Sequence, residues 1–114
     1  MDEKKKLTLI WTTGDPLTAE HMVLIYATNA MLNRWWDEVT VVLWGAAQKL
    51  AAENEAVRLK MEVAEKAGVK FSACLSCAVN LRTRETLEDM GVEVIRWGAK
   101  LTELLQSGQS VLTV

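Results

Sequence analysis

The chain has 114 residues; half are apolar, a quarter are charged, and there is one proline and six glycines. This composition is typical of one folded domain and excludes a disordered or low-complexity chain. The formal net charge is −2, which argues against nucleic acid as a direct partner, because nucleic-acid binders usually carry a clear basic excess.

Strands and helices are predicted to alternate along the whole chain. Strands are expected at residues 7–11, 38–44, 69–73, 92–97 and 111–114. Helices are expected at residues 16–35, 46–67, 78–90 and 100–106. This order predicts a single three-layer α/β/α domain over residues 1–114, with a mostly parallel five-stranded sheet of uncertain strand order. Residues 1–6 form a charged lead-in to that domain.

The start of the chain predicts neither a signal peptide nor a membrane anchor. The apolar run at residues 7–11 is too short for a signal-peptide core. No stretch approaches the roughly 18 apolar residues that a membrane span requires. We therefore expect a cytoplasmic protein with no membrane partner. In a reducing compartment its two cysteines are more often thiols than a structural disulfide.

The first predicted helix carries more apolar surface than a sheet can cover. Asp15 and Pro16 are suited to its N-cap and first position. Residues 22–27 are apolar around the whole helix, and Trp35 and Trp36 follow at its end. A helix that covers one face of a sheet needs only one apolar stripe. We expect the surplus to pack against another subunit, so that the protein is a homo-oligomer.

Cys74 and Cys77 are the most informative residues for chemistry. Cys74 is predicted at the end of a strand, and Cys77 at the start of the following helix. Backbone N–H groups and the positive end of the helix dipole stabilise a thiolate or a persulfide anion there and lower its pKa. Arg82 and Arg84 follow within two helical turns and would add positive potential. Buried cysteine is also a common small core residue, which is the plain alternative.

A C-x-x-C pair has three usual interpretations. A thioredoxin-type disulfide needs a cis-proline opposite the cysteines, and the single proline, Pro16, is elsewhere. Structural zinc needs four ligands, whereas this chain has two cysteines and one histidine. The third interpretation is a sulfur-handling or sulfur-sensing thiol whose neighbouring cysteine resolves it. We expect no metal site.

Other candidate site residues follow the first two strands. Thr12, Thr13, Gly14 and Asp15 are expected to bind an anion at a helix start, although Asp15 also suits a plain helix cap. Trp44 and Gly45 form the matching turn after the second strand, and Trp97 ends the fourth. His21 is the one histidine, placed to act as a base or to remain solvated. The chain has neither a phosphate loop nor a dinucleotide motif, so no cofactor is expected.

Three segments are distinctive when taken together. They are VKFSACLSCA at residues 69–78, WGA at 44–46 with a Lys-Leu pair at 49–50, and LTELLQSG at 101–108 leading into VLT at 111–113. Together they resemble the DsrE/DsrF-like family, also called the DsrE/TusD/YchN type, across nearly the whole length. Members are small α/β proteins linked to sulfur relay.

The resemblance implies roles for the two cysteines. Cys74 matches the family's sulfur-carrying position, and Cys77 matches only a branch with a second cysteine. Residues 80–84 replace a glycine often found there. The resemblance also implies homotrimers or homohexamers, with a sulfur donor or acceptor protein as a further partner.

Three functions therefore remain open. The first is a sulfur carrier or sulfurtransferase-like protein that holds a persulfide on Cys74, while Cys77 resolves or receives the sulfur and the two turns wall the site. The second is a non-catalytic oligomeric module of the same fold that binds a small ligand or a protein. The third is a redox switch in which Cys74 and Cys77 form a reversible disulfide.

Overall fold

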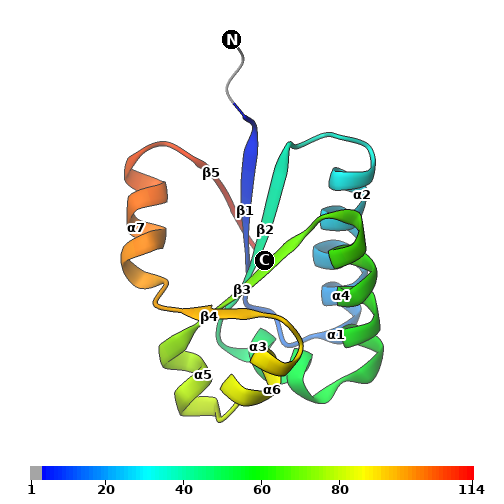
Figure 1. The fold of residues 1–114 in the computed structure, drawn as a ribbon, viewed down its shortest axis with the longest axis vertical. Coiled ribbons are helices and arrows are strands. Elements are labelled where there is room, and N and C mark those ends of the chain that lie inside the picture. Colours follow the sequence, from blue (N-terminus) through cyan, green and yellow to red (C-terminus); the bar gives the residue numbers. More distant parts are fainter. Residues whose placement is uncertain (1–3) are drawn as a thin grey trace.

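Five parallel strands form the central sheet of the computed structural model, which describes residues 4–114 (Figure 1). The strands are β1 (Lys6–Trp11), β2 (Glu38–Leu43), β3 (Lys70–Cys74), β4 (Glu93–Ile95) and β5 (Ser110–Thr113). Their order in the sheet is β4-β3-β2-β1-β5, and every neighbouring pair is parallel. Residues 1–3 of the expected lead-in lie outside the described residues.

The helices cover the two faces of the sheet unequally. They are α1 (Pro16–Thr18), η1 (Ala19–Leu24), α2 (Ile25–Leu32), α3 (Ala46–Glu53), α4 (Glu55–Ala67), α5 (Leu75–Leu81), α6 (Arg84–Asp89) and α7 (Gly98–Gln106). Figure 1 shows α7 alone on one side of the sheet and α2 with α4 on the other. The predicted three-layer α/β/α class is therefore confirmed.

Each face of the sheet has its own apolar core. Leu9, Trp11 and Val41 pack with side chains of η1, α2 and α4 in the larger core. Ile10 and Val42 point to the opposite face and pack beneath Leu101 and Leu104 of α7. Alternate residues of one strand thus enter opposite cores, which explains why the second half of β2, residues 41–43, is continuously apolar.

The connections after β3 and β4 lead to opposite faces of the sheet. The chain leaves β3 through α5 and α6, and Leu87 of α6 joins the larger core. It leaves β4 through α7, on the other face. Ligands of open α/β sheets bind at the carboxyl edge where neighbouring connections diverge in this way. Cys74 lies at that point, because it pairs with Ile95 of β4.

The first helix begins as predicted but ends earlier. The carboxylate of Asp15 accepts hydrogen bonds from the backbone N–H of Thr18 at 3.0 Å and from its hydroxyl at 2.7 Å. The middle segment η1 is a π-helix that joins α1 to α2 without a break. Arg34 adopts a left-handed φ of 56°, so the helix ends at Leu32 rather than near Trp35.

Two helices predicted as continuous are divided. The segment 46–67 breaks at Asn54, whose extended backbone leaves α3 and whose side chain caps α4 by accepting from the N–H of Val57 at 3.0 Å. The segment 78–90 breaks at Arg82, which has a left-handed φ of 58°, and α5 begins at Leu75 rather than Ala78. No helix within residues 4–114 has the length and apolar character needed to cross a membrane.

Candidate functional site

Both thiols lie at the carboxyl end of β3. Cys74 is the last residue of the strand and the N-cap of α5, and Cys77 lies in the first turn of that helix. Both are free thiols. Cys74 is only 6 % exposed and packs with Ile10, Val42 and Trp97 beneath α7. Cys77 is half-buried, so the more accessible sulfur of the pair is Cys77 rather than the predicted nucleophile Cys74.

Burial raises the pKa of the Cys77 thiol above its usual value. The backbone N–H of Gly45 donates to Cys77 and lowers its pKa, but the desolvation is larger. The hydrogen bond and charge of the neighbouring Cys74 raise it further. The expectation that a helix start depresses this pKa is therefore wrong for Cys77. Arg84, expected to add positive potential, instead pairs with Glu88 at 3.4 Å.

The turn after β2 closes over the thiols. Gly45 has φ 65° and ψ −130°, a conformation that a residue with a Cβ adopts only under strain. The backbone N–H of this glycine is the group that lowers the pKa of Cys77. Trp44 is half-buried in the same cluster as Cys74 and Cys77. The structure thus brings the predicted Trp44–Gly45 turn together with both cysteines.

The Thr12–Asp15 turn after β1 uses its donors within the chain. The backbone N–H groups of Thr12 and Thr13 both donate to the carbonyl oxygen of Val114, at 2.7 and 3.2 Å. The N–H of Asp15 donates to the hydroxyl of Thr13 at 3.1 Å. These contacts join the ends of β1 and β5, and they occupy three of the four backbone N–H groups that the predicted anion cradle would offer. Asp15 serves as a helix cap.

The two turns nevertheless touch. A Cβ built on Gly14 would lie 3.0 Å from the Cβ of Ala46, the residue that follows Gly45. The Thr12–Asp15 turn therefore supports the Gly45 turn from the side and lies one strand further from the cysteines. His21 is exposed on η1.

Sequence reasoning missed a buried hydrogen-bonded pair beside Cys74. The indole N–H of Trp97 donates to the hydroxyl of Ser72 at 2.7 Å, and that hydroxyl lies 3.0 Å from the carbonyl oxygen of Glu93. Trp97 and Ser72 are 3 % and 2 % exposed. The one signal in the sequence was Ser72, a polar residue between the apolar Phe71 and Ala73. Its partner lies 25 residues away, which no local pattern could identify.

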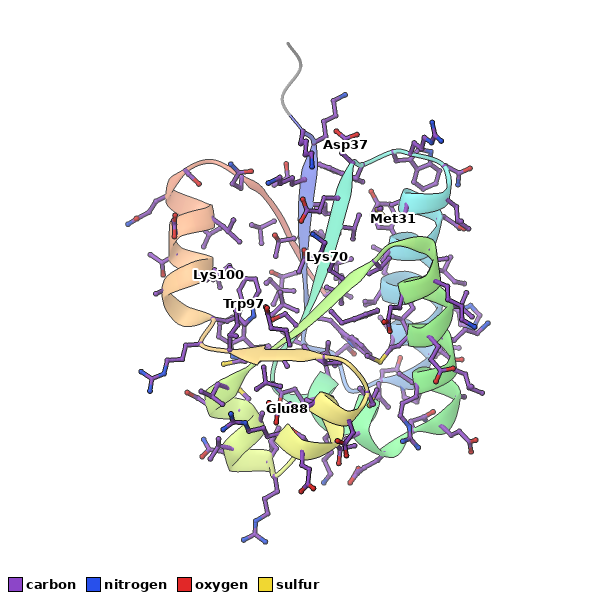
Figure 2. The ribbon with its side chains drawn as sticks, in the orientation of Figure 1. Met31, Asp37, Lys70, Glu88, Trp97 and Lys100 are labelled. Atoms are coloured by element: carbon purple, nitrogen blue, oxygen red, sulfur yellow. The ribbon has the colours of Figure 1, made fainter. Side chains whose placement is uncertain are left out.

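A hollow of about 730 Å³ lies beside α7 rather than at the thiols. Its walls include Thr8, Ser72 and Glu93 of the sheet and Lys100 of α7, but neither cysteine. In Figure 2, Trp97 and Lys100 lie between α7 and the strands, on the side that faces Lys70. Lys100 Nζ lies 5.0 Å from the centre of the Trp97 ring.

One carboxylate at the rim of this hollow, that of Glu38, is paired with two lysines. Lys70 donates to the Glu38 carboxylate at 2.8 Å, and Lys6 approaches the same carboxylate at 3.8 Å. The bond from Lys70 is the main reason that the pKa of Glu38 is lowered. No three His, Cys, Asp or Glu side chains in residues 4–114 gather to hold a metal ion.

Comparison with known proteins gives relatives of unknown function. No family profile and no functionally curated protein matches the chain. The conserved protein of unknown function BT1422 from Bacteroides thetaiotaomicron is 32% identical, with a TM-score of 0.93 over 96% of this chain and 95% of that one. The protein of unknown function MTH1491 from Methanobacterium thermoautotrophicum is 16% identical, with a TM-score of 0.71 over 98% and 100%, and shows only a shared fold. The chain belongs to the family of the Bacteroides protein BT1422.

Proposed function

We propose that the protein is a sulfur carrier of the DsrE/DsrF-like kind, which stores a persulfide on Cys74 and exchanges it through Cys77. The observation that carries the proposal is that two free thiols lie in one apolar cluster at the carboxyl edge of a parallel sheet. The resemblance of residues 69–78 to the sulfur-relay family supports the same assignment. A reducing, cytoplasmic location fits free thiols.

Because the two thiols are unequally exposed, they have different roles in the proposed transfer. The Cys77 thiolate attacks the terminal sulfur of a donor persulfide, and the donor leaves as a thiolate. Cys74 then attacks the same sulfur, and Cys77 leaves as a thiolate that takes up a proton. Each step breaks one S–S bond and forms another, so no oxidant or reductant is needed. The raised pKa of Cys77 favours its return to the protonated form.

Loading with a cysteine desulfurase and cysteine tests this proposal. Intact mass should increase by about 32 Da, one sulfur atom, in the wild type. Cys77→Ser should remain unloaded, because the Cys74 that it leaves is 6 % exposed. Cys74→Ser should load at Cys77 and lose the sulfur quickly to added glutathione. An unloaded wild type, or Cys77→Ser loaded at the wild-type rate, would contradict the proposal.

The hollow beside α7 favours a second candidate function, a module that binds a small ligand. Its volume of about 730 Å³ lies within the roughly 300–1,000 Å³ usual for small-ligand sites. Lysine and glutamate side chains at its edge suit a zwitterion. A thermal-shift series of free amino acids separates the two functions. A shift that Lys100→Met abolishes, in a protein that takes up no sulfur, would favour the module.

The third function, a redox switch, makes a different prediction for the same thiols. Diamide treatment would then give a Cys74–Cys77 disulfide that dithiothreitol reverses at a definable potential. Formation of that disulfide without any sulfur loading would favour the switch. Loading that leaves both cysteines reducible and unlinked would favour the carrier.

A further inference from the structure

Gln48 is a wholly buried amide in the core beside the thiols. It lies on α3 between Ala47 and Ala51, and all three side chains are 0 % exposed. Burying an amide without hydrogen bonds is unfavourable by about 1–3 kcal/mol, so its partners indicate what it holds.

The amide of Gln48 joins three segments around the cysteines. Its Nε2 donates to the carbonyl oxygen of Leu43 and to that of Cys74, each at 3.0 Å. Its Oε1 accepts from the hydroxyl of Thr83 at 3.0 Å. The backbone N–H of Gln48 also donates to the carbonyl oxygen of Gly45 at 3.1 Å. One residue thus ties the end of β2, the end of β3 and the start of α6 together.

These bonds set the distance between the Gly45 turn and the turn that carries Cys77. The Leu43 carbonyl precedes Gly45 by two residues, and the Cys74 carbonyl begins the turn that carries Cys77. A side chain that binds both carbonyls holds the Gly45 turn beside the turn that carries Cys77. The Gly45 backbone N–H lowers the pKa of that thiol. The backbone pairing of β2 with β3 ends at Leu43 and Ala73, one residue before Cys74. Beyond that point the two hydrogen bonds from Gln48, rather than backbone pairing, join the ends of β2 and β3.

We propose that Gln48 is the positioning residue of the thiol pair, which sets the reactivity of Cys77 by holding the β2 and β3 ends together. The inference rests on the proposed function only in taking Cys74 and Cys77 as the working site. It concerns the thiols before any sulfur arrives, so it is measured without a sulfur donor.

The test is the pH midpoint of iodoacetamide alkylation at Cys77, followed by peptide mass. Gln48→Met keeps the length of the side chain and removes its hydrogen bonds. The midpoint should rise, and a rise of about half a pH unit should slow alkylation at fixed pH by about threefold. The pH midpoint is the deciding measurement rather than the rate. A loosened site also changes the access of iodoacetamide to the thiol, and hence the absolute rate of alkylation.

Asn54→Ala is the matched control, because it removes the N-cap bond of α4 to Val57 and destabilises the fold elsewhere. Its Cys77 midpoint should equal that of the wild type. Thr83→Val removes only the hydroxyl that holds Oε1 of Gln48, and should move the midpoint the same way by a smaller amount even if Gln48→Met fails to fold. An unchanged midpoint in the folded variants, or an equal rise in Asn54→Ala, would overturn the inference. A wild type that fails to load sulfur would overturn only the proposed function.

Discussion

The indole N–H of Trp97 donates a 2.7 Å hydrogen bond to the hydroxyl of Ser72, and this bond separates the hollow beside α7 from Cys74. Ser72 lies two residues before Cys74 on the same face of β3. Trp97 contributes both to the hollow and to the apolar cluster that covers the thiol. This indole is therefore one of the side chains that keep Cys74 buried.

Ser72→Ala tests that relationship. It leaves the buried indole N–H without an acceptor, so we expect a loss of about 1–3 kcal/mol in the free energy of unfolding by urea. In Trp97→Phe the hydroxyl of Ser72 keeps its partner, the Glu93 carbonyl. The double variant should lose less than the sum of the two single losses. Strict additivity would show that the bond contributes nothing.

Gly45→Ala should destabilise the fold by about 1–2 kcal/mol, because a Cβ disfavours positive φ. No atom lies within 4 Å of the added Cβ, so the cost is one of backbone conformation rather than of a steric clash. Gly98→Ala is the matched control, since Gly98 also has open space and begins α7 without a positive φ. It should be neutral or slightly stabilising in the same urea titration. Equal losses in the two variants would contradict the argument.

The raised pKa of Cys77 predicts a loss of stability in alkali. Folding favours the neutral thiol, so its contribution is complete below the thiol's pKa in the unfolded chain. It declines as the pH rises towards the raised folded-state pKa. The free energy of unfolding of wild type minus that of Cys77→Ser should therefore fall between about pH 8 and 10. A difference that does not change with pH would contradict the assignment.

The pair of Lys70 with Glu38 predicts an effect in acid. The lowered pKa of Glu38 stabilises the fold above the pKa that this carboxyl has in the unfolded chain. The contribution is lost as the pH falls through the lowered pKa. Lys70→Met should cost no more than about 1 kcal/mol at pH 7, because the Lys70 side chain is largely exposed, and nothing at pH 2. Lys66→Met, on exposed α4 surface, should show no such pH dependence.

Helix α2 and its neighbours present the apolar surface that we expect to bind a second copy of the chain. Leu17, Met22, Ile25, Leu32 and Trp35 are each between 38% and 66% exposed. Ile25→Glu should shift the sedimentation coefficient towards the monomer, because a charge in an apolar interface is desolvated. Leu105→Glu, at an α7 leucine that is 58% exposed compared with 41% for Ile25, should leave it unchanged. A wild type that is monomeric at micromolar concentration would contradict the expectation.

Local sequence patterns predicted the five strands and the helix starts at residues 16 and 46, because their signals are local. Asp15 with Pro16 marked the first helix, and Val57, Met61 and Ala64 are buried as the stripe on α4 predicted. The break at Asn54 could have been predicted, because asparagine is a preferred N-cap residue. The long run of helix-forming residues on both sides of it favoured one continuous helix instead. The breaks at Arg34 and Arg82 carried none, since arginine rarely adopts a left-handed φ.

The candidate site was predicted only in part, because burial depends on distant residues. The placement of Cys74 at a strand end follows from the strand itself. Its low exposure depends on Val42 and Trp97, which are more than twenty residues away in either direction. Gln48 interrupts a run of small apolar residues on α3, but only the tertiary fold shows which carbonyls it binds.

The face of the sheet beneath α7 changes from charged to apolar along the strands, and this gradient specifies how the strands align. Lys6 pairs with Glu38, then Thr8 with Thr40, and then Ile10 with Val42. In a strand that is apolar on both faces, the alternation of side chains does not fix the register. A slip of two residues leaves every side chain facing the same core. Here such a slip would set Glu38 beside Thr8 and Thr40 beside Ile10. The polar half of this sheet face therefore specifies the strand register during folding, independently of any ligand that binds there.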